Sequence, residues 1–496
     1  MPDFDLGLQE LPKGLKGLDD LPRRQETLVN LFFNGEGIIR RHGIKTAVDS
    51  LDADIVGEGI CRGAAKFTNP STLLTELYQV SGTAFIRIAL DGTKTIFPLA
   101  IPGNNRVIFA KTVDFLVFIT VGGSTAFYFD GTTLTANTTV PLGGYRDIEV
   151  AENRFLYVLF NGSAIELSDN TTGGTNNPDD IVDVFNAEDL PDLNTGIFNN
   201  NGDIFIGGTD SFQLFRFNPI EGISIPFTKV DRATDNTGYV SGKVRYQATF
   251  AFLGQPAGES YGFFVKGQGA STEISNDAVA NILAQEYSRN ELEACVGYRV
   301  IQDNKEIIYF NLARHTFGFL QGNWFLAQSG VVAQELTANW RAAYPIFIYD
   351  RYFVGDHQDS RIGTLDPVFK EYDGTDITDN LIEWKIRTFV IYGINAEVEL
   401  ESIELDCLVG TGQIDLTVQP EEIIGTIGLV LSQDGVVFER DNEMTRSLGA
   451  AGKYRRRVNF TGSGGMGTYE IMTGIELRGT APVNFSLSAL KLGNFQ

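Results

Sequence analysis

A loose repeat constrains the fold of this chain more than any other feature: an apolar run of strand length, a glycine-bearing turn and a second strand. The segments 115–131 (FLVFITVGGSTAFYFDG) and 154–168 (RFLYVLFNGSAIELS) show the unit most clearly. Glycine adopts positive φ at no steric cost, so such turns join hairpin strands. Successive copies start about 38 to 57 residues apart, as four-stranded propeller blades do, the other starts lying near Leu77, Ile204, Tyr261, Ile307 and Tyr352. We therefore expect an all-β fold with a β-propeller of six or seven blades, and a pair of β-sandwiches with regular hairpins is the alternative.

The rest of the chain indicates how it divides into domains. At 496 residues the chain is too long for one ordinary core. After about residue 379 the loose repeat gives way to longer alternating strands, which are typical of a β-sandwich. The segment 275–290 (SNDAVANILAQEYSRN) starts with capping residues and has one apolar face, which predicts an inserted helix. The expected organisation is an N-terminal arm (1–29), a propeller (30–375) and a C-terminal sandwich-like domain (380–496).

Composition restricts the chemistry that the chain can perform. The 63 Asp and Glu against 39 Lys and Arg give a net charge of −24, which repels nucleic-acid backbones at long range. Three His and three Cys, all dispersed, leave no clustered ligand set and no nucleophile–base constellation. We therefore expect no catalytic residue, no bound metal and no cofactor. The N-terminus has no secretory signal, and no apolar run approaches the roughly 18 residues of a membrane span, so we expect no membrane insertion.

Two charged segments near the C-terminus are candidates for contacts. Arg455, Arg456 and Arg457 form a basic run that we expect to pair with the neighbouring acidic surface or with another subunit, as a subunit interface. On a strand Arg456 points away from the other two. Three acids also share one face of a strand, where they form either a solvated surface or a surface turned toward a channel or partner; they are Glu397, Glu399 and Glu401. Ile403 and Leu405 follow with the same parity, so a β-bulge near Ser402 must separate the two halves.

Two further motifs suggest chemistry but favour turns. The segment 432–438 (SQDGVVF) resembles the Asp-box hairpin of sialidases, in which Asp and Gly shape a turn and an aromatic residue packs beneath it. The loop 366–379 (DPVFKEYDGTDITD) offers oxygen ligands for calcium, but its spacing matches no EF-hand loop. We interpret both segments as structural turns.

Four stretches of the chain resemble the packaged-DNA stabilisation proteins of short-tailed phages, which form the tail nozzle. The first is 28–31 (LVNL) followed by 40–44 (RRHGI), where His42 replaces the proline that is usual in that family. The second is 204–217 (IFIGGTDSFQLFRF), and the third is 291–330, with IIYF at 307–310. The fourth combines SQDG at 432–435, SLG at 447–449 and YRRRV at 454–458.

This resemblance implies a β-propeller body in a ring of six identical subunits around a DNA passage. The implied partners are the portal adaptor protein, a tail needle or plug, and tailspikes or fibres, while double-stranded DNA passes through without sequence-specific binding. The implied role is to retain packaged DNA in the virion and to conduct it during ejection, after assembly of the tail in the host cytoplasm. A propeller-bearing glycan-binding or glycan-cleaving, sialidase-like protein is the alternative. Self-assembly separates the two classes, because a nozzle must form a closed ring.

Overall fold

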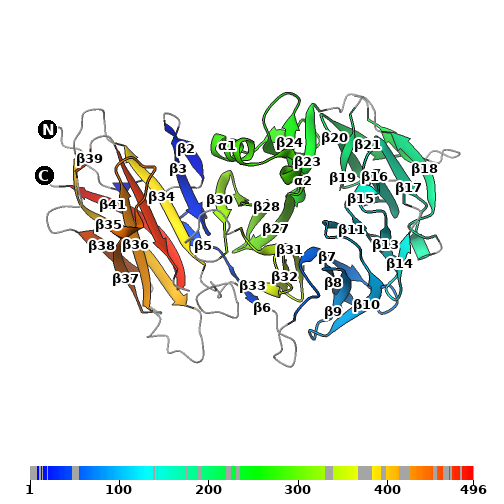
Figure 1. Ribbon diagram of the computed structural model, residues 1–496, viewed down its shortest axis with the longest axis horizontal. Helices are drawn as coiled ribbons and strands as arrows, with labels where there is room; N and C mark the ends of the chain where they lie inside the picture. The colour runs from blue at the N-terminus through cyan, green and yellow to red at the C-terminus, as the bar shows by residue number, and fades with distance from the viewer. Residues whose placement is uncertain are drawn as a thin grey trace.

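The computed structural model describes residues 8–9, 13, 15–18, 21–46, 55–137, 140–141, 143–174, 176–186, 192–218, 225–230, 235–329, 339–366, 382–391, 398–412, 424–450, 455–461, 468–469, 472–480 and 483–494. Almost all regular structure in these ranges is β-strand. Figure 1 shows two bodies side by side, a radial array of sheets and a sandwich of longer strands.

Seven four-stranded antiparallel units form the radial array in the described part of the chain. Blades 1 to 4 are made of β7 (Cys61–Thr68), β8 (Thr75–Ser81), β9 (Ala84–Ile88) and β10 (Lys94–Ala100); β11 (Val107–Lys111), β12 (Leu116–Thr120), β13 (Ala126–Phe129) and β14 (Leu134–Asn137); β15 (Tyr145–Ala151), β16 (Arg154–Leu159), β17 (Ala164–Ser168) and β18 (Ile181–Asn186); and β19 (Asn194–Asn200), β20 (Asp203–Gly208), β21 (Phe212–Phe217) and β22 (Phe227–Lys229). Blades 5 to 7 are made of β23 (Thr237–Tyr246), β24 (Thr249–Pro256), β25 (Gly262–Lys266) and β26 (Thr272–Glu273); β27 (Val296–Gln302), β28 (Lys305–Asn311), β29 (Thr316–Leu320) and β30 (Asn323–Ala327); and β31 (Ala342–Ile348), β32 (Arg351–Asp356), β33 (Ile362–Asp366) and β6 (Gly43–Thr46).

The innermost strands of these blades close a ring. The strands β7, β11, β15, β19, β23, β27 and β31 contact one another in that order, and β31 also contacts β7. The expectation of an all-β propeller with six or seven blades is therefore confirmed, with seven.

The repeated apolar runs of the sequence are mostly the second strands of the blades. β12 and β20 are buried along their whole length, and β8 is buried at every position after its first. A strand that lies between two others in its blade and is covered on both faces can have apolar residues at successive positions, so its sequence need not alternate. In blade 5 the run that starts at Tyr261 is the third strand, β25.

An N-terminal strand completes the last blade. β6 pairs antiparallel with β33, with Thr46 opposite Gly363 and Ile44 opposite Leu365. Blade 7 therefore combines residues from the two ends of the propeller region, and main-chain hydrogen bonds fasten the ring.

The C-terminal body is a sandwich of two antiparallel sheets, as the sequence indicated. One sheet contains, in order, β3 (Leu21–Val29), β34 (Trp384–Ile391), β40 (Met472–Gly479), β36 (Ile424–Ser432) and β37 (Met444–Ala450), and β2 (Lys16–Leu18) pairs with β3. The other contains β38 (Arg455–Thr461), β35 (Val398–Gly412), β41 (Val483–Asn494), β5 (Ile38–Arg40) and β4 (Leu31–Phe33), with β1 (Leu8–Gln9) and β39 (Thr468–Tyr469) at its margins. The buried rings of Trp384 and Phe485 stack between the sheets, with centroids 4.3 Å apart.

More of the N-terminal residues belong to the sandwich than the sequence indicated. β3 pairs with β34, and β5 pairs with β41, with Ile39 opposite Ser486. Residue 30 onward was expected in the propeller, but β4 and β5, within residues 31–40, pair in the sandwich sheet that contains β41.

A buried asparagine and a buried arginine join the two bodies. β3 pairs in parallel with β30 of blade 6 at Val29 and Leu326. The next residue, Asn30, has a left-handed backbone (φ 57°), and its side chain donates to Glu383 O at 2.6 Å. Its Oδ1 accepts from Arg41 Nε at 2.7 Å and from Gln328 N at 2.8 Å. These bonds connect the sandwich, blade 6 and the segment leading to β6.

Arg41 strengthens this junction through its planar group. Its guanidinium carbon lies 3.3 Å from the ring centroid of Trp340, and Nη2 donates to Gln328 O at 2.6 Å. Burial lowers the pKa of Arg41 to about 9. The family-like stretches 28–31 and 40–44 therefore meet at the junction between propeller and sandwich.

Helical structure is sparse in the described ranges. The segment 275–290 contains α1 (Asp277–Glu286), and the Asn276 side chain caps it by accepting from Val279 N at 3.1 Å. Val279 and Leu283 are buried against the aromatic core between blades 5 and 6. The remaining elements are α2 (Arg289–Glu293), η1 (Thr172–Gly174) and η2 (Arg440–Asn442). None of the helices in the described residues is long and apolar enough to cross a membrane.

Candidate functional site

Side chains cross the axis of the propeller at the start of the innermost strands. Arg106, just before β11, donates from Nη1 to Cys295 O at 2.7 Å, so blade 2 contacts the segment that leads into blade 6. Arg62 is buried on β7 and donates to Gly82 O at 2.9 Å and to Asn105 O at 2.8 Å. Burial lowers the pKa of Arg62. At this end of the axis the Arg106 bond therefore joins blade 2 to the segment before blade 6, and Arg62 joins blade 1 to the start of blade 2.

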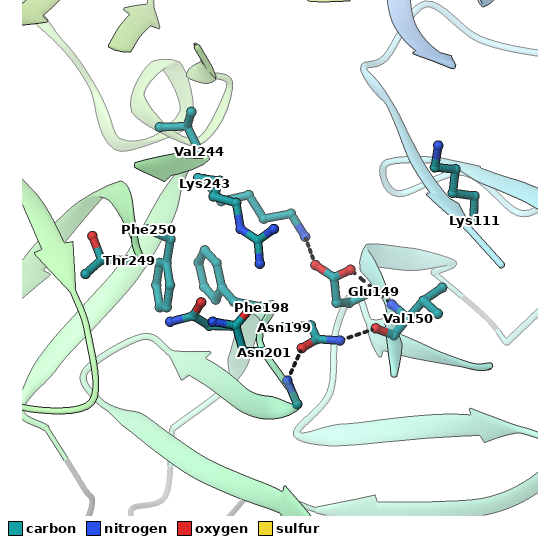
Figure 2. Close-up of a pocket in the computed structure, with 13 residues that line it drawn as sticks. Lys111, Glu149, Val150, Phe198, Asn199, Asn201, Lys243, Val244, Thr249 and Phe250 are labelled. Atoms are coloured by element: carbon teal, nitrogen blue, oxygen red, sulfur yellow. Dashed lines mark hydrogen bonds and ion pairs between the residues drawn. The ribbon is translucent and has the colours of Figure 1, made fainter. Parts of the chain in front are cut away.

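The other end of the axis contains a hollow of about 560 Å³, which Figure 2 shows. It lies where the innermost strands of blades 2 to 5 end. Lys243 is aimed toward it by a bulge in β23 between Ser241 and Val244. Its Nζ lies 2.6 Å from Asp147 Oδ1 and 4.0 Å from Glu149 Oε2. Burial raises the pKa of Glu149.

Most polar groups around this hollow are already bonded within the protein. Asn199 Nδ2 donates to Val150 O at 2.6 Å, and its Oδ1 accepts from Gly202 N at 3.0 Å (Figure 2). Lys111 Nζ donates to Lys66 O at 2.7 Å. These bonds hold the ends of the inner strands together, so we interpret the hollow as part of the scaffold.

The lining offers little reactive chemistry. Its hydroxyl group, on Thr249, donates to Tyr246 O at 2.8 Å. Among the described residues, no group of three or more His, Cys, Asp and Glu side chains could hold a metal ion. Burial raises the pKa of the thiols of Cys61, Cys295 and Cys407 to about 12.

The arginine run lies on β38, the edge strand of the second sandwich sheet. Arg455 is opposite Leu408, Arg456 opposite Cys407 and Arg457 opposite Asp406. The Arg457 side chain is 72% exposed, and its Nε lies 3.5 Å from Glu404 Oε1. Arg456 is half-buried. The interpretation of this run as a subunit interface stays a prediction.

The acidic segment lies at the start of β35. Glu397 is outside the described residues, whereas Glu399 and Glu401 are on β35. The register between β35 and β41 shifts between Leu400 and Ser402, so the β-bulge expected near Ser402 is confirmed. Leu400 and Ile403 are both buried, which shows that the inward parity changes across it.

The Asp-box-like segment is a turn held by its own side chains. Asp434 Oδ1 accepts from Val436 N at 2.8 Å and from Val437 N at 2.9 Å, and Ser432 Oγ accepts from Gly435 N at 3.0 Å. The guanidinium of Arg387 lies over the Phe438 ring at 4.2 Å. These contacts agree with the structural interpretation of the segment. The loop considered for calcium, 367–379, lies outside the described residues.

Sequence reasoning missed the residues at the propeller axis. Arg106 and Lys243 stand beside strand-like runs, but no pattern in the sequence indicates that Arg106 reaches Cys295 or that Lys243 reaches Asp147. A signal was available for Lys243, because Gly242 before it has φ +70°, and glycine inside a strand run indicates a bulge.

The fold defines a class of protein: a seven-bladed propeller joined to a β-sandwich, with side chains that bond between blades at the propeller axis. The model of the family described as "Bacteriophage P22 Gp10, beta-propeller" matches residues 10–370. The chain therefore belongs to this family of packaged-DNA stabilisation, tail nozzle proteins. It is a family of phage structural proteins, which implies a component of the virion tail.

Other comparisons add no functional information. No curated protein matches the chain. The N-terminal domain of Nup159 is 11% identical and has a TM-score of 0.40, covering 72% of this chain and 100% of its own. The computationally designed Ika8 protein is 8% identical with a TM-score of 0.37, covering 65% of this chain and 99% of its own. BBS1N in complex with ARL6DN is 11% identical with a TM-score of 0.37, covering 66% and 98%. No argument rests on these similarities.

Proposed function

We propose that this chain is the tail nozzle subunit of a short-tailed phage, which assembles as a ring of six copies below the portal and its adaptor. The ring would close the DNA exit channel, retain the packaged genome and conduct it during ejection. The observation that carries the proposal is the family match over residues 10–370.

The bonds between blades at the propeller axis support a passage between copies. A double helix cannot pass along the axis of one propeller, because Arg106 and Lys243 bond to groups on other blades. A conduit for DNA must therefore be enclosed by several subunits. The proposal places Glu397, Glu399 and Glu401 toward this conduit or toward a partner, since carboxylates do not bind the phosphates that lysine and arginine would retain.

Charge makes assembly sensitive to salt. Six copies at −24 each would carry −144, and that repulsion must be offset by apolar burial and by ion pairs between subunits. Raising the salt concentration screens both effects. Association that strengthens with salt would show that repulsion dominates, and association that weakens would show that interfacial ion pairs dominate.

The test is assembly of the purified chain, alone and with the adaptor ring, followed by electron microscopy and sedimentation velocity. The proposal expects closed rings of six, on the adaptor if not in isolation. A tail needle and tailspikes or fibres should bind to the assembled ring. A chain that stays monomeric at every salt concentration, with the adaptor present, would overturn the proposal.

A further inference from the structure

The outermost strand of blade 3, β18, has the features of an uncovered contact surface. Ile181, Val182 and Val184 are 36%, 42% and 51% exposed. A register shift between Leu167 and Ser168 explains why Ile181 and Val182 both face solvent. The outer edge of β18 pairs with no strand in the described part of the chain. An exposed apolar edge strand is a site for pairing with another chain.

Acidic residues decide which partner this edge can accept. Asp179 and Asp180 precede β18, and Asp183 lies within it. Tyr128 on the neighbouring blade lies within the field of Asp179, Asp180 and Asp130, and these carboxylates help burial to raise its pKa. A second copy of β18 placed against this edge would set like charges opposite one another, which is destabilising. The partner surface must be basic with an apolar component.

The β38 edge of the sandwich has that character. Arg456 and Arg457 lie at its N-terminal end, and Leu408, which pairs with Arg455, is 48% exposed beside them. The pair between Arg457 and Glu404 is exposed, and such pairs contribute only about 0–1 kcal/mol, so the guanidinium is available to a partner.

The two halves of β38 differ in how well they are covered. Arg446 on β37 donates to Asn459 O at 3.2 Å and to Thr461 O at 3.5 Å, which covers the C-terminal half of the outer edge. In the described residues, no bond of this kind covers the outer edge at Arg455 to Arg457. A partner can therefore contact the N-terminal half of β38.

We infer that the β18 edge of one copy binds the N-terminal half of β38 on the next copy. The inference rests on the proposed function, because it names the contact that would join the ring. The two surfaces lie at opposite ends of the long axis of the molecule (Figure 1), so they cannot meet within one chain. A contact between two different surfaces is heterologous and generates a ring when the rotation closes. Apolar side chains of β18 meet Leu408, and Asp179, Asp180 and Asp183 meet the arginines.

The experiment uses two variants of the full chain that each disable one surface. Val182→Lys/Val184→Lys changes β18, and Arg456→Glu/Arg457→Glu changes β38; all four side chains reach solvent, so the fold should be kept. Each variant alone should associate more than about a hundredfold more weakly, because placing like charges together costs several kcal/mol. Mixed together, the two variants keep one unchanged contact and set the lysines of β18 against the glutamates of β38, so the mixture should associate more strongly than either variant alone.

A charge exchange within one chain and two control variants complete the test. Asp179→Arg/Asp180→Arg combined with Arg456→Glu/Arg457→Glu should restore assembly. Val113→Lys and Arg351→Glu change exposed side chains elsewhere and should assemble like the unchanged chain. Sedimentation velocity over a range of protein concentration, with the adaptor present, gives the readout.

The outcomes separate this contact from the proposed function. If the unchanged chain forms rings and both edge variants form them equally well, the contact is wrong and the nozzle function stands. If either variant dimerises by itself, or if their mixture associates no more strongly than either variant alone, the contact is not the heterologous one inferred here. If the unchanged chain never assembles, the nozzle function fails and this contact fails with it.

Discussion

Replacing Asn30 by alanine tests how the propeller and the sandwich are held together. The change removes one acceptor used by Arg41 Nε and Gln328 N, and one donor used by Glu383 O. Each buried group left without a partner costs about 1–3 kcal/mol, and a left-handed residue other than Gly, Asn or Asp costs about 1–2 kcal/mol. Because these effects overlap, we expect a loss of about 3–6 kcal/mol, out of a typical stability of 5–15 kcal/mol.

The assay combines urea unfolding with amide hydrogen exchange. Leu28 and Leu31 belong to a hydrophobic core that also contains Tyr309 of blade 6 and Trp384 of the sandwich, so the unchanged chain should unfold these parts together. In Asn30→Ala the sandwich should unfold at lower urea than blades 1 to 5. The amide of Gln328, which donates to Asn30, should lose protection.

A matched control separates the hydrogen bonds from the backbone conformation. Asn201 also has a left-handed backbone (φ 56°), but no hydrogen bond of its side chain occurs in the described residues. Asn201→Ala should therefore show the conformational cost alone, about 1–2 kcal/mol. If Asn30→Ala is no more destabilising than Asn201→Ala, the junction does not depend on these bonds and the reasoning is refuted.

Four further predictions follow from other parts of the structure. Gly144→Ala should destabilise the chain strongly, because a Cβ there would lie 1.9 Å from Gly123 O. Gly173 has a similar positive φ but open space around it, so Gly173→Ala should lower the free energy of unfolding much less, as chemical denaturation of both variants can measure. Acidification from about pH 7.5 to 5.5 should lower the free energy of unfolding. Burial keeps the pKa of His315 and His357 below the roughly 6.5 of the unfolded chain, so the unfolded state binds more protons. A His315→Gln/His357→Gln variant should lose this part of the pH dependence of stability. The buried thiols of Cys61, Cys295 and Cys407, whose pKa burial raises to about 12, should resist a thiol reagent until urea unfolds the chain, and rapid native labelling would contradict their burial. A panel of sialosides and other glycosides should not be hydrolysed, and turnover that Glu149→Gln abolishes would contradict the structural interpretation of the hollow.

The repeat region could be predicted from sequence because its second strands carry a strong signal. Leu116 to Thr120 is apolar almost throughout since it is covered on both faces, and a glycine turn (Gly122-Gly123) follows it. The bulge in β35 was also predictable, because a change in inward parity between Leu400 and Ile403 has one simple geometric cause. Both signals are local, so neither needs knowledge of a distant partner.

The N-terminal strands and the axis were not predictable for the opposite reason. β6 is four residues long, too short to show a period, and its partner β33 lies at the far end of the propeller region. Likewise, Arg106 and Arg62 bond to main-chain carbonyls, which every residue has, so no residue type marks the partner. Asn30 and Arg41 lie in stretches that resemble the phage family, but only their contacts show that they join the propeller to the sandwich.

The strand β6 also determines the order in which the protein can fold during synthesis. A ribosome makes residues 43–46 before any complete blade, yet the strand with which they pair, β33, is made after blades 1 to 6. Sequential blades can form along the nascent chain from local hairpins, while the earliest residues wait without partners. The ring cannot close until translation has passed residue 366. A chain truncated before that point should therefore leave an open last blade exposed to other chains, which links complete synthesis to the formation of a subunit fit for assembly.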